Sequence, residues 1–346
     1  MKKFIGSHNE WDKLEEVILG NVSNAQKPIL TRDQLAIEYP QFINKENPSV
    51  KPFEDRVIEE TKEDLENLQS QLEQLGIKVR RPKEVDYSKT IKTPDWETDG
   101  FYGYCPRDSV LVVGDKLIEA PMTMRSRLLE QYAFKDIMMD YFTEGAHWIS
   151  APKPELLDRT YSFDKNRLAL ANYEPIFDAA NVLRAGEDLF YLISNTGNEL
   201  GAKWLERAVG DKYNIHLCRD IYGGIHIDST ISLLRPGLVL LNPERVTEDN
   251  IPEPLKKWDK IWCPEMVDSP LTEENPLSSI WIGMNLIMLA PDLALVDSKQ
   301  EHLIRALNKH GIEVMGFDLR HSRTLGGGFH CSILDTKRKS KMEKYF

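Results

Sequence analysis

Cysteine, long apolar runs and an excess of basic charge are scarce or absent in this chain of 346 residues. The four cysteines, Cys105, Cys218, Cys263 and Cys331, are widely spaced, with no CxxC pair and no Cys and His cluster at zinc-finger spacing. These spacings argue against a disulfide framework and against structural zinc. They fit a reducing cytoplasm, in which one cysteine can serve as a free nucleophile.

No stretch of about 18 apolar residues predicts a membrane span. Residues 1–21 mix charged and single apolar side chains, which does not support a signal peptide. The 44 basic and 55 acidic residues give a formal net charge of −11, which opposes binding to nucleic acid and attracts cationic small molecules to an acidic concave site. We therefore expect a soluble, cytoplasmic protein with neither nucleic acid nor a membrane as its partner.

Strands, turns and helices alternate along the chain in one recurring order. Four copies of a strand, a Gly or Pro turn and a second strand are expected. They are Ser109–Val113 with Leu117–Ala120, Asn181–Arg184 with Leu189–Ser194, Ser229–Leu234 with Leu238–Asn242, and Trp281–Leu289 with Leu293–Asp297. The second copy continues into a helix at Glu199–Val209, and the fourth into a helix at Gln300–His310 and a strand at Ile312–Phe317.

A looser fifth copy occupies the N-terminal part, with a strand at Leu14–Leu19, an amphipathic helix at Phe53–Leu75 and a strand at Ile77–Arg80. Residues 24–47 predict an irregular loop. Because one such unit cannot bury its apolar face alone, the degenerate copies predict a closed, pseudo-symmetric α/β domain over residues 1–346. Residues 337–346 are expected to form a polar, solvated tail.

The segment Gly326–Gly327–Gly328–Phe329–His330–Cys331 is the sharpest local feature. Three glycines permit positive φ angles and a close approach of the backbone to a ligand, and they lead to a single cysteine before Ile333 and Leu334. Cys331 is therefore a candidate nucleophile at the mouth of a strand. A glycine-rich turn that leads into a buried core thiol explains the same residues equally well.

The segment His226–Ile227–Asp228–Ser229–Thr230 follows two glycines and predicts a strand. Since side chains alternate along a strand, His226 and Asp228 are expected side by side on one face, as acid–base chemistry on a cationic substrate requires. A histidine with a purely structural role remains an alternative.

Two further aspartates, Asp178 and Asp108, each precede an apolar strand at the position that His226 holds in its own copy. Each of them alone is explained as a turn residue. A closed ring of copies, however, directs both aspartates toward one centre together with His226 and Cys331.

In order and spacing, the motifs of this chain resemble those of the amidinotransferase family that contains glycine amidinotransferase and the inosamine-phosphate amidinotransferases. The motifs are Cys105–Pro106–Arg107–Asp108, Phe177–Asp178–Ala179–Ala180, His226–Ile227–Asp228–Ser229–Thr230, Asn242–Pro243–Glu244–Arg245, Ser278–Ser279 and Gly326–Gly327–Gly328–Phe329–His330–Cys331. The resemblance covers nearly the whole chain. It implies the pentein fold, a five-bladed α/β propeller of ββαβ units around a central site, and it favours a homodimer.

The resemblance also implies a role for each matching residue. Cys331 would be the nucleophile, with His226 and Asp178 completing a catalytic triad. Asp108 and Asp228 would hold the guanidinium of arginine, and the donor's carboxylate would be held by Arg245, Ser278 and Ser279. No metal ion or organic cofactor is implied.

A guanidinium is a poor electrophile because its charge is delocalised over three nitrogens. Carboxylates fix its plane through forked N–H bonds, and the bound cation favours the thiolate of a nearby cysteine. Attack by Cys331, with protonation of the departing amine by His226, releases ornithine and leaves an amidino-cysteine intermediate. An acceptor amine then resolves the intermediate, which gives ping-pong kinetics.

Two other interpretations remain open from the residues. A hydrolase of the arginine-deiminase type uses the same Cys, His and Asp but admits water to the intermediate, and a non-catalytic propeller could bind a partner. The motifs favour transfer to an amine in a biosynthetic or natural-product pathway, with glycine, lysine or an inosamine phosphate among the acceptors. Gly223–Gly224–Ile225 stands where glycine-accepting members of the family carry bulkier residues, which implies room for a larger acceptor.

Overall fold

The computed structural model describes residues 5–268 and 275–346. Within these residues the strands form five three-stranded sheets and a small two-stranded sheet. The three-stranded sheets are β17 (Ile333–Arg338), β1 (Leu14–Leu19) and β2 (Lys78–Arg80); β5 (Val110–Val113), β6 (Lys116–Glu119) and β7 (His147–Ser150); β8 (Val182–Ala185), β9 (Asp188–Leu192) and β10 (Asn214–Cys218); β11 (Ile231–Arg235), β12 (Leu238–Leu241) and β13 (Asp259–Trp262); and β14 (Ile287–Ala290), β15 (Leu293–Asp297) and β16 (Glu313–Phe317). The small sheet pairs β3 (Ile91–Lys92) with β4 (Glu97–Thr98).

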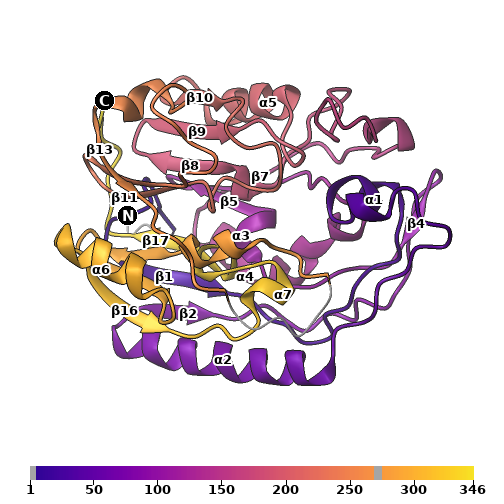
Figure 1. Ribbon diagram of the computed structural model, residues 1–346, viewed down its shortest axis with the longest axis horizontal. Coiled ribbons are helices and arrows are strands. Elements are labelled where there is room, and N and C mark those ends of the chain that lie inside the picture. The colour runs from indigo at the N-terminus through magenta and orange to yellow at the C-terminus, as the bar shows by residue number, and fades with distance from the viewer. Residues whose placement is uncertain (1–4, 269–274) are drawn as a thin grey trace.

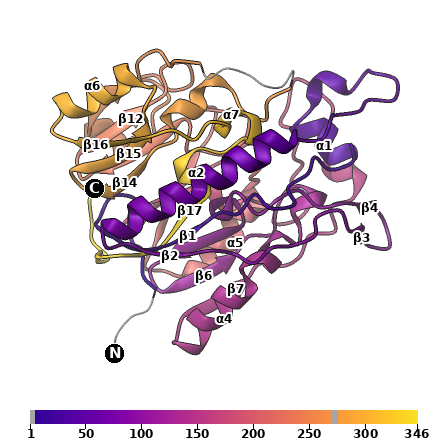
Figure 2. The same cartoon turned by 90° about the horizontal axis from the view of Figure 1, so that it is seen from below.

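Each three-stranded sheet has the same pairing, antiparallel between its first two strands and parallel between its second and third. A parallel pair needs a crossover connection. In four sheets it contains a helix, namely α2 (Asp55–Gln74), α4 (Lys135–Thr143), α5 (Glu199–Val209) or α6 (Glu301–Lys309), and between β12 and β13 it contains the 3₁₀ helix η6 (Glu253–Lys257). Helices α2, α5 and α6 lie at the periphery of the molecule (Figures 1 and 2). The repeated ββαβ order confirms the predicted α/β propeller, and the five sheets agree with five blades.

The long helix α2 shows how the sequence pattern produces a blade. Its residues Val57, Leu65, Leu68 and Leu72 recur at helical spacing, and all four are fully buried. They pack with apolar residues of strand β1, such as Val17 and Leu19, in one core cluster. The predicted helix is therefore confirmed, although it begins two residues later than expected.

The two ends of the chain meet in the first sheet, where β17 pairs antiparallel with β1. This pairing makes part of the predicted solvated tail wrong, because Lys337 and Arg338 belong to β17. Arg338 is buried and its Nε lies 2.6 Å from Oδ2 of Asp335. Further on, the ring of Tyr345 packs edge-on against Trp11 at a centroid distance of 4.9 Å. The predicted tail is thus held at its start by strand pairing and one buried ion pair, and near its end by an aromatic contact, which a prediction from composition does not include.

Three predicted segments have a different local structure. Residues 227–230 form a turn that precedes β11, and His226 before it has a φ of 59°. The expected strand Trp281–Leu289 begins as the 3₁₀ helix η7 (Ile280–Met284), which Ser279 caps. The expected irregular loop 24–47 contains helix α1 (Arg32–Ile37) and the 3₁₀ helix η1 (Pro40–Phe42).

Short helices or turns lead into the first strand of each blade and bring the candidate site residues with them. They are α3 (Pro106–Ser109) before β5, η5 (Ala179–Asn181) before β8, the turn at 227–230 before β11, η7 before β14 and α8 (Phe329–Ser332) before β17. The remaining short helices are η2 (Arg125–Arg127), η3 (Glu130–Phe134), η4 (Asp158–Thr160) and α7 (Ser322–Leu325). Among the described residues, no helix has both the length and the apolar character needed to cross a membrane.

Candidate active site

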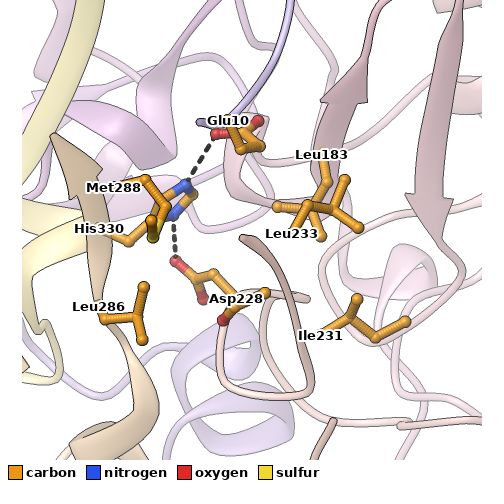
Figure 3. A pocket seen from close by; sticks show the side chains of 9 residues that line it. Glu10, Leu183, Asp228, Ile231, Leu233, Leu286, Met288 and His330 are labelled. Carbon is orange, nitrogen blue, oxygen red and sulfur yellow. Dashed lines mark hydrogen bonds and ion pairs between the residues drawn. The ribbon is translucent and has the colours of Figure 1, made fainter. Parts of the chain in front are cut away.

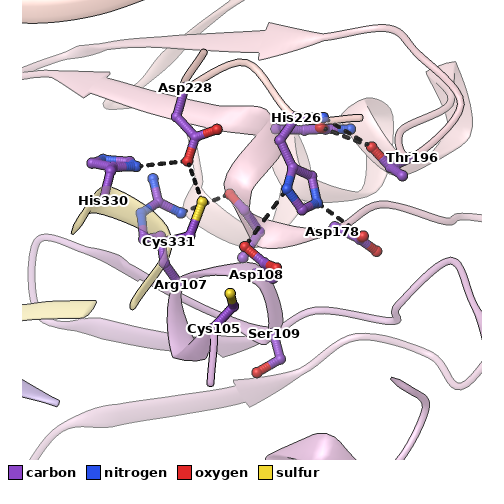
Figure 4. Close-up of polar contacts among 12 residues, drawn as sticks. Cys105, Arg107, Asp108, Ser109, Asp178, Thr196, His226, Asp228, His330 and Cys331 are labelled. Atoms are coloured by element: carbon purple, nitrogen blue, oxygen red, sulfur yellow. Dashed lines mark hydrogen bonds and ion pairs between the residues drawn. The ribbon is translucent and has the colours of Figure 1, made fainter. Parts of the chain in front are cut away.

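Cys331 lies on α8 at the end of the glycine triplet and is only 2% exposed. Its Sγ lies 3.3 Å from Oδ2 of Asp228 (Figure 4). It also lies 3.3 Å from Nδ2 of Asn285. The glycines are needed because a Cβ on Gly327 would come within 2.5 Å of Sγ of Cys105, and Gly326 has a φ of 72°. The predicted placement of Cys331 immediately before a strand is confirmed.

The surroundings of Cys331 favour the neutral thiol. Contact with the Cys105 thiol, burial and the negative charges of Asp228 and Asp108 together raise its pKa well above the ordinary value. A bound guanidinium would offset both carboxylates and so favour the thiolate. For Cys218 and Cys263, burial raises the pKa to about 12, and neither belongs to this cluster.

His226 faces two carboxylates from different blades. Its Nε2 lies 3.1 Å from Oδ2 of Asp178, and its Nδ1 lies 3.6 Å from Oδ1 of Asp108. Burial lowers the pKa of His226, but the charges of Asp108, Asp178 and Asp228 and the hydrogen bond to Asp178 outweigh burial and raise it to about 9. The His226 ring is therefore an imidazolium, with both nitrogens protonated, at neutral pH.

Asp178 is fully buried and is fixed by Thr123, whose backbone N–H and hydroxyl both donate to its Oδ1, at 2.8 and 2.9 Å. The other carboxylate oxygen is then directed at His226. This arrangement orients the imidazole and stabilises its protonated form.

One carboxylate oxygen of Asp108 accepts a hydrogen bond, and the other accepts none. Oδ2 accepts from Nη1 of Arg127 at 2.9 Å, while Arg127 also makes a forked pair with Glu130. Oδ1 is buried and has no hydrogen-bond partner among residues 5–268 and 275–346. Because burial raises the pKa of Asp108 and this oxygen accepts no hydrogen bond, the site favours a cation with N–H groups at that oxygen.

Asp228 does not lie beside His226 on a strand face, as the sequence pattern predicts. The positive φ of His226 turns the chain, so that Asp228 contacts Cys331 and His330, whereas His226 contacts Asp178. Burial opposes ionisation of Asp228, but hydrogen bonds and charges from His330, the charge of His226 and the Cys331 hydrogen bond hold its pKa well below the ordinary value.

Arg245 is held in a fixed orientation above Tyr222, with its guanidinium carbon 3.7 Å from the ring centroid. Its Nη1 donates to Ser229 and Thr230, and its Nη2 donates to Oγ of Ser279 at 3.4 Å. Arg245 and Ser279 are thus brought together as predicted. The hydroxyl of Ser278 donates instead to the backbone oxygen of Arg323 at 3.2 Å.

Sequence reasoning missed several groups of the site. Asn285 supports α8, since its Oδ1 accepts from the backbone N–H of His330 and Cys331 at 2.9 and 3.3 Å. Glu38 follows α1, which is docked by a bond from the backbone N–H of Arg125 to Asp33. Burial raises the pKa of Glu38 to about 7, and it interacts electrostatically with Arg127 and His226. The position of Asn285 before β14, equivalent to Cys331 before β17, is the one signal that the sequence offered.

The described ranges contain no group of three or more His, Cys, Asp or Glu side chains with the geometry of a metal site. The side chains that meet at this site are a thiol, an imidazolium and carboxylates. Together they suit nucleophilic attack on a planar cation.

No model of a protein family matches the chain. Inosamine-phosphate amidinotransferase 1 of Streptomyces glaucescens is 51% identical, with 99% of each chain covered. L-arginine:L-lysine amidinotransferase of Pseudomonas savastanoi pv. phaseolicola is 38% identical, covering 98% of this chain and 96% of the relative. Mitochondrial glycine amidinotransferase of Xenopus tropicalis is 37% identical, with coverages of 98% and 84%.

Solved structures similar to this chain also include amidinotransferases. The inosamine-phosphate amidinotransferase of Streptomyces griseus superposes with a TM-score of 0.96 at 52% identity, over 99% of each chain. An amidinotransferase of the saxitoxin pathway from Microseira wollei gives 0.90 at 36% identity, also over 99% of each chain. A DDAH from Pseudomonas aeruginosa gives 0.59 at 12% identity, covering 93% of this chain and 99% of the other, a likeness that extends to the fold alone.

Proposed function

Because the chain belongs to the amidinotransferase family, we propose that it takes the amidino group from L-arginine, carries it on Cys331 and passes it to an amine. The observation that supports this most strongly is the convergence of a thiol, an imidazolium and three carboxylates from four separate blades. The donor is proposed as arginine because the relative from Pseudomonas savastanoi is an L-arginine:L-lysine amidinotransferase.

Arginine binding uses two separate sets of groups in this proposal. Oδ1 of Asp108 and the carboxylate of Asp228 accept N–H bonds from the guanidinium, whose planar fork matches carboxylates. Arg245 and Ser279 bind the α-carboxylate, and their mutual hydrogen bond holds them in place beforehand. The guanidinium carbon then lies within reach of Sγ of Cys331.

In the first half-reaction, the cation bound between the carboxylates lowers the thiol pKa, so that the thiol proton is released to solvent as arginine binds. The thiolate then attacks the guanidinium carbon. The neutral tetrahedral adduct receives the proton of the His226 imidazolium on the nitrogen that joins it to the rest of arginine. That C–N bond breaks, so that ornithine leaves as a neutral amine and a cationic amidino-cysteine remains. Asp178 orients His226 throughout, and its charge keeps the imidazole protonated beforehand.

In the second half-reaction, the acceptor amine attacks the amidino carbon and transfers a proton to His226. The adduct then collapses, which breaks the C–S bond, restores the thiolate and releases a guanidino product. Water must not compete at this stage, and the low exposure of Cys331, 2%, is consistent with that requirement.

The proposed acceptor is an amine larger than glycine, of the inosamine-phosphate type, in a biosynthetic pathway. The 51% identity to the relative from Streptomyces glaucescens supports this choice over glycine, for which the named relative is 37% identical. The ring of Tyr222 fills the space beside Gly224, so the proposed choice of acceptor rests on these identities.

A panel of amines tests the proposal. The protein is incubated with arginine and, in separate reactions, glycine, lysine and an aminocyclitol phosphate, and ornithine, citrulline and guanidino products are measured. Catalytic ornithine release that depends on the aminocyclitol phosphate is expected. Multiple turnovers to citrulline without an amine would indicate the arginine-deiminase type of chemistry, and no turnover of arginine with any amine would point to a non-catalytic propeller.

A further inference from the structure

The His330 side chain bridges two buried carboxylates behind the nucleophile. Its Nδ1 lies 3.0 Å from Oδ2 of Asp228, and its Nε2 lies 3.2 Å from Oε2 of Glu10. Figure 3 shows the three side chains in a row, with the imidazole in the middle. Glu10 comes from the N-terminal segment, so the row joins three parts of the chain that are distant in sequence.

The two hydrogen-bond partners of the His330 ring determine its charge. An ionised carboxylate only accepts hydrogen bonds, so a ring that bonds two carboxylates donates from both nitrogens and is an imidazolium. Glu10 is ionised because it also accepts from the backbone N–H, Nε and Nη2 of Arg184, at 3.0, 2.8 and 2.9 Å. Asp228 accepts a further bond from the Cys331 thiol, which needs an acceptor oxygen.

The surroundings insulate the row from solvent. Five apolar side chains line the space beside it, namely Leu183, Ile231, Leu233, Leu286 and Met288. The cavity among them has a volume of about 10 Å³, too small for any substrate. Removal of one partner from such a buried ion pair is costly, because it leaves the other charge buried and unpaired.

Charged groups face the row from several elements. Arg107 on α3 opposes the charge of His330, whereas Glu10 and Asp228 favour it. Asp228 interacts electrostatically with His226, Arg107 and Arg245. Glu10 interacts electrostatically with Arg184 and Arg107. The carboxylates are the only groups that hydrogen-bond the ring among the described residues.

We infer that Glu10 and His330 are positioning residues, which keep Asp228 ionised and oriented so that it receives the donor's guanidinium beside Cys331. This inference rests on the proposed function. The bonds from His330 and Cys331 both end at Oδ2 of Asp228. Oδ1 is thereby left for the guanidinium, and Oδ2 is turned toward the sulfur. Glu10 acts through His330 and does not touch the reacting atoms.

The test replaces Glu10 with Gln and measures KM for arginine against pH. A glutamine oxygen or nitrogen can pair with a neutral ring, so the His330 pKa falls toward its ordinary value of about 6.5. In Glu10→Gln, KM should equal the wild-type value at pH 6 and rise about tenfold by pH 8, with a smaller change in kcat, because a neutral His330 no longer gives Asp228 the charge-assisted hydrogen bond that fixes its orientation. Wild type should show no such step.

Asp335→Asn provides the matched control, since Asp335 pairs with Arg184 at 2.7 Å without touching His330. It should lack the step in KM. A step of equal size in Asp335→Asn, or none in Glu10→Gln, would overturn the inference while leaving amidino transfer by wild type intact.

A second measurement does not need activity or a folded variant. NMR of wild-type protein labelled at histidine should show His330 doubly protonated from pH 6 to pH 8. A neutral His330 ring at pH 7 would contradict the inference, and it would leave the proposed function untouched.

Discussion

Sγ of Cys331 and Oδ2 of Asp228 lie 3.3 Å apart, so the resting thiol donates its proton toward the carboxylate. This contact links nucleophile and substrate binding. The negative charge of Asp228 stabilises the neutral thiol of Cys331. A guanidinium that binds the carboxylate offsets this charge and so removes that stabilisation. Arginine would in this way activate the group that attacks it.

The Asp228→Asn variant separates these two effects. Loss of the negative charge should lower the thiol pKa, so alkylation of Cys331 by iodoacetamide at pH 8 should become faster in the free protein. At the same time KM for arginine should rise by about tenfold to a hundredfold, because one charge-assisted hydrogen bond to the guanidinium is lost. Rates of alkylation, followed by peptide mass spectrometry, and steady-state kinetics measure the two changes.

Asp33→Asn is the control for that variant, because Asp33 is also fully buried but contacts Arg125 outside the cluster. It should leave both the alkylation rate and KM for arginine near their wild-type values. Slower alkylation in Asp228→Asn would contradict the account of the resting thiol.

Protonation of His226 predicts a pH dependence of stability. The folded pKa of about 9 exceeds the ordinary value of 6.5, so this stabilisation is fully present below pH 6.5 and is lost as the pH rises through 9. Between pH 7 and 9 the free energy of unfolding should fall by about 2 kcal/mol from this group. Urea denaturation at a series of pH values measures the change.

Asp178→Asn should reduce that slope, because it removes one of the carboxylates that raise the His226 pKa. The carboxyl groups of Glu38 and Glu130, whose pKa values burial raises to about 7, lose their own contribution mainly below pH 7 and do not obscure the test. An unfolding free energy that stays flat from pH 7 to 9 in wild type would refute the protonated imidazole.

The pair Gly223 and Gly224 offers a test of the carboxylate site. A Cβ on Gly224 would come within 2.4 Å of the Tyr222 ring, which stacks on Arg245. Gly224→Ala should therefore displace Tyr222, loosen Arg245 and raise KM for arginine by about threefold to tenfold. Kinetics with arginine and with a guanidine that lacks a carboxylate measure the effect, which should be confined to arginine.

Gly223→Ala is the matched comparison, since its Cβ would meet only the flexible end of Leu168, at 3.2 Å. It should change KM for arginine by less than about twofold. Equal effects of the two substitutions on both substrates would show that Tyr222 and Arg245 do not bind the donor's carboxylate.

The sequence predicted the repeat and the positions before its strands because both follow from local apolar patterning. Cys331, Asp178 and Asp108 all precede the first strand of a blade, as the repeat required. The local conformation of His226 was not predictable, since a φ of 59° at a histidine is set by the surrounding fold and opposes local preference.

Long-range contacts account for the other gaps. Arg127 reaches Asp108 across 19 positions, and Glu10 reaches His330 across 320. Neither pair has a local signature, and the contact of Glu10 with His330 exists only once β1 and β17 have paired. Ser278 was expected beside Arg245, but its hydroxyl donates to the backbone oxygen of Arg323, a contact that the motif does not predict.

The most direct measurement is the mass of the protein after incubation with arginine alone, followed by digestion and location of any adduct. The account predicts one amidino group on the peptide that contains Cys331, one equivalent of ornithine, and loss of the adduct when an acceptor amine is added. Cys331→Ser should show no adduct and no ornithine. An amidino group on another residue, or turnover that persists in Cys331→Ser, would contradict the account.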